Sequence, residues 1–414
     1  MSTYGATQMP PSSREYSRKA SIVGIGESDF GVDYQAERKR PEGWAPPTLE
    51  SLTLTAFERA LADSGLRRED IDGVACSFTY GGPPAEEVAK HLGIEAKWAI
   101  ANGNIMAGPL PVVCAAIAEG KAETVAMVFA VASRSAGRQF GGLTHSVGGM
   151  PDPEGEGGAP SSYYYYHPWG WSSQAAHWAL IFANYQWRYG KREEDLAEVA
   201  MQVRRHAMAR PNAVMRKELT LEDYMASRYI VRPLHLFDIC VVNDGAVCLI
   251  VRKADLARGL AQTPVDVAGW SWAKVKSNKM DVMVRQQLRP IIRRAGDEAL
   301  AMAGVSLADV GHFEGYDAGS MHLINQVEGI GFCEQGTGLD FCKDGQMTVG
   351  GRIPTNTEGG NLSYAYMQGW SQVAECVRQL RGTAGTYQAP DLDVSVSNLA
   401  QTDQSHPIVF VRGE

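Results

Sequence analysis

Two tyrosines lie in loops that could form a catalytic site. Tyr316 stands in the segment EGYDAG (314–319), directly after a predicted strand, and Tyr366 stands in NTEGGNLSYAYMQGW (356–370), before a predicted helix. Loops at the strand ends of α/β folds carry binding and catalytic residues more often than cores do. Two such hydroxyls can act as base and acid. The alternative is that each tyrosine packs in the core with its hydroxyl bonded.

The second loop offers further candidates. Its glycine pair, Gly359-Gly360, would let the backbone approach a ligand closely. A polar loop that then enters a helix suits the stabilisation of an oxyanion or enolate, so the N–H groups near these glycines are candidate donors. Asp317 is expected to orient a partner. The alternative is a glycine-rich connection with aromatic filler, and we favour the functional loop.

Two earlier turns give no support to other chemistry. The segment GIGESD (24–29) lacks the third glycine of a dinucleotide-binding turn, because Asp29 stands in its place. The segment NGNIMAG (102–108) precedes a predicted helix, where backbone N–H groups would favour a nucleophile or an anion. It carries no Ser, Cys or Thr, so by itself it is interpreted as an ordinary turn.

Composition narrows the class of protein. The chain has 414 residues and a net charge of −8, which argues against nucleic acid as the main partner. No apolar run is long enough to span a membrane. The polar residues 1–19 are expected to form a disordered tail rather than a signal peptide. The seven cysteines form no C-x-x-C pair, and Cys114, Cys240 and Cys248 are interpreted as buried thiols in a reducing cytoplasm.

Short apolar segments alternate with helical patterns and predict an α/β fold with a mostly parallel sheet. In the first series we expect strands at 21–26, 71–77, 98–101 and 122–131, and helices at 48–65, 85–92 and 109–120. Residues 137–162 are dense in Gly and Pro, and helices at 193–209 and 219–227 follow before the sheet resumes at 237–253. A second series contains a helix at 284–304, a strand at 312–315, a helix at 371–380, and strands at 394–399 and 408–412.

The two series share a spacing that indicates duplication. An A-L-A triplet at 60–62 is followed by Gly65 and Asp70, and an A-L-A triplet at 299–301 is followed by Gly304 and Asp309. Each then enters an apolar strand. With the repeated order of strands and helices, this spacing predicts two related halves.

Two other clusters leave alternatives open. The aromatic stretch 163–189 would suit a lid over a bulky ligand or a protein interface equally well. Arg204, Arg205, His206 and Arg210 are interpreted as a solvated helix face, and a contact to a CoA phosphate is the sharper alternative.

From residue 21 to residue 412 the chain resembles the thiolase superfamily, and most closely its sterol-carrier-protein-type branch. The resemblance is carried by the helix and strand before Cys76, by the region from Tyr189-Gly190 to Ser227, and by RPLHLFD (232–238) followed by NDGA (243–246).

The departures from this family concern its catalytic residues. Ile105 stands in the place of the nucleophilic cysteine. The family's Asn-Glu-Ala-Phe or His-Asp-Cys-Phe loop resembles residues 316–319, where Tyr316 replaces the Asn or His and Ala318 replaces the Cys. Tyr366 replaces the His of the family's Gly-His-Pro loop. The last loop, SNLA (397–400), has no cysteine. The resemblance therefore does not extend to acyl transfer through a thiol.

In these departures the chain resembles one subgroup of the superfamily, the lipid-transfer-protein-type aldolases of steroid side-chain degradation. The resemblance implies retro-aldol cleavage of a β-hydroxyacyl-CoA to a 17-keto steroid and a short acyl-CoA such as propionyl-CoA. It implies Tyr316 and Tyr366 as the catalytic pair, and it leaves open which is base and which is acid. It implies no prosthetic group, with coenzyme A present only as part of the substrate. The resemblance implies two protein partners: a second copy of this chain, in a homodimer, and an OB-fold protein of the acyl-CoA-associated type. Together they would form a heterotetramer.

The fold implied is the thiolase-like one: two duplicated βαβαβαββ halves in a five-layered α-β-α-β-α arrangement. We expect the N-terminal half at 20–135 and 236–262, an inserted loop domain at 136–235, and the C-terminal half at 263–414. Two other functions stay open. One is a thiolase or acyl-CoA acyltransferase with a different nucleophile, and the other is a non-catalytic subunit that binds CoA esters.

Overall fold

The structure is a computed structural model that describes residues 9–78, 82–101, 109–137, 173–275, 288–400 and 404–413. The first half contains the 3-10 turn η1 (Arg14–Tyr16), β1 (Ala20–Glu27), α1 (Phe30–Lys39), α2 (Leu49–Ser64), η2 (Arg68–Asp70), β2 (Gly73–Phe78), α3 (Ala85–Leu92), β3 (Trp98–Ala101), α4 (Pro109–Ala118) and β4 (Thr124–Ala132). It resumes after the insertion with β7 (Asp244–Lys253) and α9 (Ala254–Ala257).

The second half follows the same order of elements. It contains β8 (Val265–Trp270), β9 (Ala273–Lys274), α11 (Leu288–Ala303), η5 (Leu307–Asp309), β10 (His312–Gly315), α12 (Ser320–Ile330), α13 (Gly338–Lys343), the π-helical turn η6 (Gly360–Tyr364), α14 (Trp370–Arg381), η7 (Gly385–Tyr387), β11 (Val394–Ala400) and β12 (Gln404–Arg412). The sequence therefore located most elements, but α1, α12 and α13 were not predicted.

Strand pairing confirms the duplication. In the first half β1 pairs antiparallel with β7, β7 antiparallel with β4, and β4 parallel with β2. In the second half β8, β12, β11 and β10 repeat this pattern in the same order. The antiparallel pair β1–β8 joins the two halves into one sheet. The prediction of a mostly parallel sheet was wrong, because the last strand of each half returns antiparallel between the first strand and the parallel ones.

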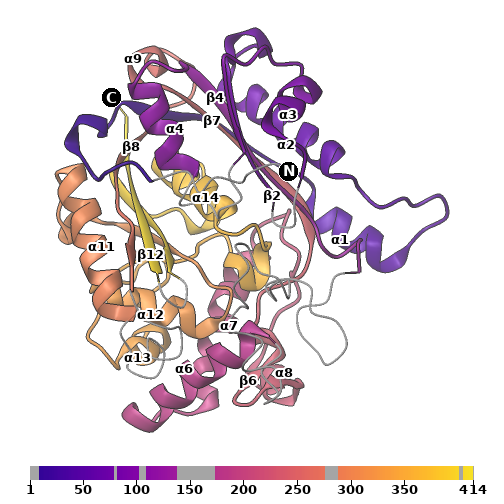
Figure 1. Cartoon of the computed structure of the whole chain (residues 1–414). Helices are drawn as coiled ribbons and strands as arrows, with labels where there is room; N and C mark the ends of the chain where they lie inside the picture. The colour runs from indigo at the N-terminus through magenta and orange to yellow at the C-terminus, as the bar shows by residue number, and fades with distance from the viewer. Residues whose placement is uncertain are drawn as a thin grey trace, which may run out of the picture.

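The apolar clusters show five layers, as Figure 1 illustrates. Helices α2 and α3 pack on one face of the first half-sheet. Helices α4 and α14 share a cluster with strands of both halves and therefore lie between them. Helices α11 and α12 cover the outer face of the second half-sheet. A glycine lets each outer helix approach its sheet: a Cβ on Gly26 would lie 2.0 Å from Ala56 O, and one on Gly269 would lie 2.2 Å from Ala299 O.

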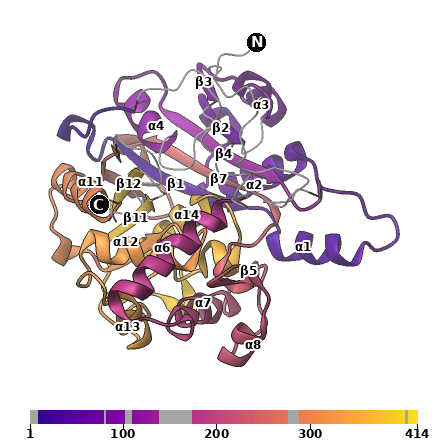
Figure 2. The same cartoon turned by 60° about the horizontal axis from the view of Figure 1, so that its bottom comes forward.

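The described part of the insertion lies at one end of the molecule, at the bottom of Figure 1, and it comes to the front in Figure 2. It contains α6 (Gln174–Tyr189), α7 (Glu193–Met208), α8 (Leu221–Ala226), the hairpin of β5 (Tyr229–Val231) and β6 (Leu234–His235), and the turn η4 (Leu236–Asp238). The expected strand at 237–253 begins only at Asp244. Residues 239–243 are instead a non-helical segment that runs into the candidate site, where Cys240 N donates to Ala318 O at 3.0 Å.

Candidate active site

The fold brings the two predicted tyrosines into direct contact. The hydroxyl oxygens of Tyr316 and Tyr366 lie 3.0 Å apart, within hydrogen-bond distance, although the residues are 50 positions apart in the chain. Tyr316 is 3% exposed, whereas Tyr366 is half-buried. The pair therefore consists of two hydrogen-bonded hydroxyls, one on a buried side chain and one on a more accessible side chain.

Tyr316 is held by its backbone on both sides. It follows β10 directly, and its N–H donates to Asn398 O at 2.9 Å on the neighbouring strand β11. The amide of Gln326 on α12 binds the backbone of Tyr316 twice, accepting from Tyr316 N and donating to Tyr316 O at 2.7 Å. These bonds fix the position of the Tyr316 backbone at the end of β10.

Tyr366 is positioned from the other half of the molecule. Its N–H donates to Asn243 Oδ1 at 2.8 Å, directly before β7. The π-helical turn η6 precedes it, and such turns often occur at functional sites. The sequence pointed to this loop, but nothing in its pattern indicated that Asn243 would support it.

Asp317 ties the two tyrosine loops together. Its Oδ1 accepts from the N–H and the side-chain amide of Asn361 at 2.8 and 2.9 Å, and from Gln372 Nε2 at 3.2 Å. Burial raises the pKa of Asp317 to about 6, although these donors oppose the shift. The carboxylate therefore holds the loop that leads to Tyr366, and its role in orienting a partner in the reaction stays a prediction.

The glycine pair serves packing. Gly359 N donates to Asn356 O at 3.0 Å, so this N–H is already bonded. Gly360 has φ +60°, and a Cβ there would lie 2.0 Å from Asp317 Oδ2. The Gly359 N–H is therefore not available to an enolate, whereas the role of the other N–H groups near this pair stays a prediction. Both glycines allow close contact between the loop and its supports.

Burial keeps Tyr316 protonated. It raises the pKa of this phenol well above its usual range, and the neighbouring Tyr366 and Cys240 raise it further. Burial disfavours the phenolate because the charge loses its hydration. A lowered pKa, which a basic role would need, is thus not found at Tyr316.

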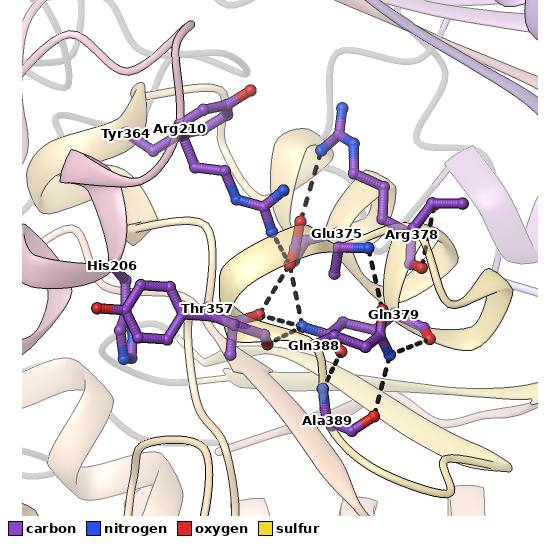
Figure 3. Close-up of polar contacts among 12 residues, drawn as sticks. His206, Arg210, Thr357, Tyr364, Glu375, Arg378, Gln379, Gln388 and Ala389 are labelled. Carbon is purple, nitrogen blue, oxygen red and sulfur yellow. Dashed lines mark hydrogen bonds and ion pairs between the residues drawn. The ribbon is translucent and has the colours of Figure 1, made fainter.

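Behind the loops lies a buried polar network, shown in Figure 3. Glu375 on α14 is fully buried and accepts hydrogen bonds from Arg210, Thr357 and Gln379, with Arg378 Nη1 at 3.6 Å. Arg378 and the Tyr364 hydroxyl each bind Glu27 Oε2 of β1 at 2.6 Å. The network therefore links both halves and the insertion to the loop that carries Tyr366.

The basic cluster of α7 is not a solvated face. Arg204 is 5% exposed, and its guanidinium binds Ser363 Oγ at 2.9 Å and Lys217 O at 3.0 Å. His206 is buried and bonded through both nitrogens, and Arg210 pairs with Glu375. Only Arg205, with half of its side chain exposed, fits the prediction. A helical pattern alone could not indicate these buried polar partners.

Cys240 lies at the site, and the prediction that its thiol is buried was wrong. It was interpreted as fully buried, but it is half-buried and close enough to Tyr316 to affect its pKa. Burial raises the pKa of the Cys240 thiol to about 12. Cys114 and Cys248 are buried as predicted. Ile105 and the aromatic residues 163–172 lie outside the described residues, so their predictions stay untested.

No group of three His, Cys, Asp or Glu side chains within the described ranges is arranged to hold a metal ion. None of the helices described is long and apolar enough to cross a membrane.

Comparison with known proteins finds related sequences over most of this chain. Residues 273–409 match a family described as thiolase C-terminal domain-like. A steroid side-chain-cleaving aldolase from Thermomonospora curvata is 32% identical over 88% of this chain and 91% of its own length. A 17-hydroxy-3-oxo-4-pregnene-20-carboxyl-CoA lyase from Mycobacterium tuberculosis is 34% identical over 89% of this chain and 93% of its own.

A solved structure, the Ltp2-ChsH2(DUF35) aldolase, has the same fold as this chain. It superposes with a TM-score of 0.81 at 28% sequence identity, over 96% of this chain and 99% of the matched one.

Proposed function

The chain belongs to the thiolase-like family of steroid side-chain-cleaving aldolases, and we propose that it is a carbon–carbon lyase acting on a β-hydroxyacyl-CoA. The observation that carries this proposal is the 3.0 Å contact between the Tyr316 and Tyr366 hydroxyls. The substrate class is supported by the name of the lyase relative, in which a 17-hydroxyl is β to a CoA thioester. Cleavage between C17 and C20 would give a 17-keto steroid and propionyl-CoA.

We assign the base role to Tyr366 and the acid role to Tyr316. Tyr316 stays protonated and can donate to the Tyr366 oxygen, and this hydrogen bond favours the phenolate of Tyr366. Tyr366 takes the 17-hydroxyl proton, the C17–C20 bond breaks, and its electrons move to the thioester as an enolate. Tyr316 then protonates C20, and the proton on Tyr366 returns to Tyr316 across the 3.0 Å hydrogen bond.

This assignment predicts the pH dependence of kcat. The pair must lose one proton before it holds a base, so kcat rises with pH. The acid form of Tyr316 persists above pH ~10, the ordinary tyrosine pKa, because its pKa is raised. Steady-state rates from pH 6 to 9.5 should therefore rise with pH without an alkaline fall. A fall below pH 9 would contradict the acid role of Tyr316.

The reaction type is tested with matched β-hydroxy and β-keto acyl-CoA steroids. We expect only the β-hydroxy compound to yield a 17-keto steroid and a short acyl-CoA, identified by mass spectrometry, with and without an OB-fold partner protein. A retro-aldol step needs the hydroxyl proton, whereas thiolysis needs a β-keto group and a nucleophile. Cleavage of the β-keto compound alone would reject the aldolase and favour a thiolase.

If the protein is instead a thiolase with a different nucleophile, the candidate nucleophile is Cys240, the half-buried thiol near the tyrosine pair. A pKa of about 12 leaves almost no thiolate at neutral pH, which opposes this role. A Cys240→Ala variant that still cleaves, together with no acyl adduct by intact mass, separates the two mechanisms. A binding-only subunit would show neither product nor adduct.

We propose two protein partners. The name of the matched structure, the Ltp2-ChsH2(DUF35) aldolase, contains the names of two proteins. This supports an assembly of this chain with an OB-fold partner protein. A homodimer is supported by β3, a half-buried edge strand that pairs only with β2 in the described part of the sheet. All seven cysteines are free thiols, which supports the cytoplasm as the compartment.

A further inference from the structure

A histidine without hydrogen-bond partners lies beside the catalytic pair. His322 stands in the first turn of α12, six residues after Tyr316, and is 3% exposed. Neither ring nitrogen has a hydrogen-bond partner among the residues that the structure describes. Two buried histidines of the polar network behind the loops differ, because His206 and His312 are bonded through both nitrogens.

The ring of His322 is fixed between two aromatic side chains. It lies 4.9 Å from the Trp178 ring, edge to face, and 6.4 Å from the Tyr316 ring at an interplanar angle of 22°. Gly319 makes room for the indole, since a Cβ there would lie 2.9 Å from Trp178 Cε3. The amide of Gln326 donates to both His322 O and Tyr316 O, so one side chain holds both backbones.

The unpaired imidazole is costly to keep in this position. A buried polar group without a partner loses its hydration without compensation, so native proteins contain few of them. Burial lowers the pKa of His322 to about 4. The ring is therefore neutral at physiological pH and carries one N–H donor and one acceptor nitrogen.

The proposed reaction leaves one role unfilled. Enolate formation needs a donor to the thioester oxygen, because charge develops there when the carbon–carbon bond breaks. The two tyrosine hydroxyls are engaged in proton transfer, and the N–H of Gly359 is bonded to Asn356 O. His322 is a neutral donor in an apolar setting next to Tyr316, where such a hydrogen bond is strong.

We propose that His322 donates a hydrogen bond from its ring to the thioester oxygen of the bound acyl-CoA and stabilises the enolate. This rests on the proposed aldolase function. It gives the site a third polar group that belongs to neither catalytic loop, with Trp178 of the insertion shielding it from water.

The test separates catalysis from packing. His322→Phe keeps an aromatic ring but removes the donor, and kcat should fall about 10²–10³-fold with KM little changed. Its Tm should stay equal or rise, because an unpaired buried polar group is removed. His322→Asn restores an N–H donor and should recover part of kcat. A His322→Phe enzyme with kcat near wild type would overturn the proposal.

A matched control is His406→Phe. His406 is 7% exposed, has no bonded nitrogen among the described residues, and stacks on Trp272 rather than beside Tyr316. This variant should show a similar Tm change with kcat unchanged. An equal loss of kcat in both variants would show that the loss is general and would overturn the proposal.

A binding experiment keeps this inference separate from the proposed function. In protein with ¹⁵N-labelled histidine rings, propionyl-CoA should shift a ring resonance that is missing from the His322→Phe spectrum. This readout requires no turnover, so it stands even if the wild type cleaves no β-hydroxyacyl-CoA. The absence of any shift in the His322 resonance at saturating propionyl-CoA would overturn the proposal.

Discussion

Replacing either Tyr316 or Tyr366 by phenylalanine is expected to abolish side-chain cleavage while the protein keeps its fold. Each change removes one hydroxyl of a pair that is 3.0 Å apart, so the proton can no longer enter or cross the pair. Loss of a positioned acid or base costs about 10²–10⁴-fold in kcat. The double variant should be no worse than either single variant, because residues that act as one unit are not additive.

The measurement is kcat from product formation together with Tm from thermal unfolding. Each variant should lose only about 1 kcal/mol of stability, the usual net value of one hydrogen bond. Tyr185→Phe is the matched control, since its buried hydroxyl donates to Glu328 Oε1 at 2.5 Å away from the pair. The control should lose stability and keep kcat. Near-wild-type turnover in both Tyr316→Phe and Tyr366→Phe would refute the assignment.

Glu375→Gln is expected to be the most destabilising change in the polar network. The carboxylate is fully buried and faces two guanidinium groups, Arg210 and Arg378. Neutralising one partner of a buried ion pair leaves an uncompensated charge and costs about 3–5 kcal/mol. Because Thr357 Oγ1 also binds Glu375 at 2.8 Å, the loop leading to Tyr366 should loosen and kcat should fall as well.

Urea unfolding followed by circular dichroism measures this effect. Asp297→Asn is the matched control, because its ion pair with Arg293 is more than half exposed on both sides and such pairs contribute about 0–1 kcal/mol. The free energy of unfolding should fall several-fold more in Glu375→Gln than in the control. Equal losses would mean that the buried network does not support the fold.

The sequence by itself determined the class of fold and the two principal site residues. Apolar segments that alternate with helical patterns depend on local chemistry, so the strands and most helices could be read directly. The glycine-flanked loops identified Tyr316 and Tyr366, and the resemblance explained why the pair replaces a thiol. The domain boundaries, the catalytic roles of Tyr316 and Tyr366, and the place of Ile105 in the site remain predictions from the sequence.

Tertiary structure decided what local pattern does not contain. One such property is whether neighbouring strands run parallel or antiparallel. Strand β7 pairs antiparallel with β4 and β12 antiparallel with β11, and the alternation of strands and helices in the sequence does not reveal this. The partners of Arg204 and Arg210 are buried polar groups far away in the chain, so their helical spacing suggested solvent instead. The unequal burial of Tyr316 and Tyr366 is the basis on which we propose their acid and base roles, and only the tertiary structure places His322 beside Tyr316. These properties depend on long-range packing and desolvation, which no short segment of sequence encodes.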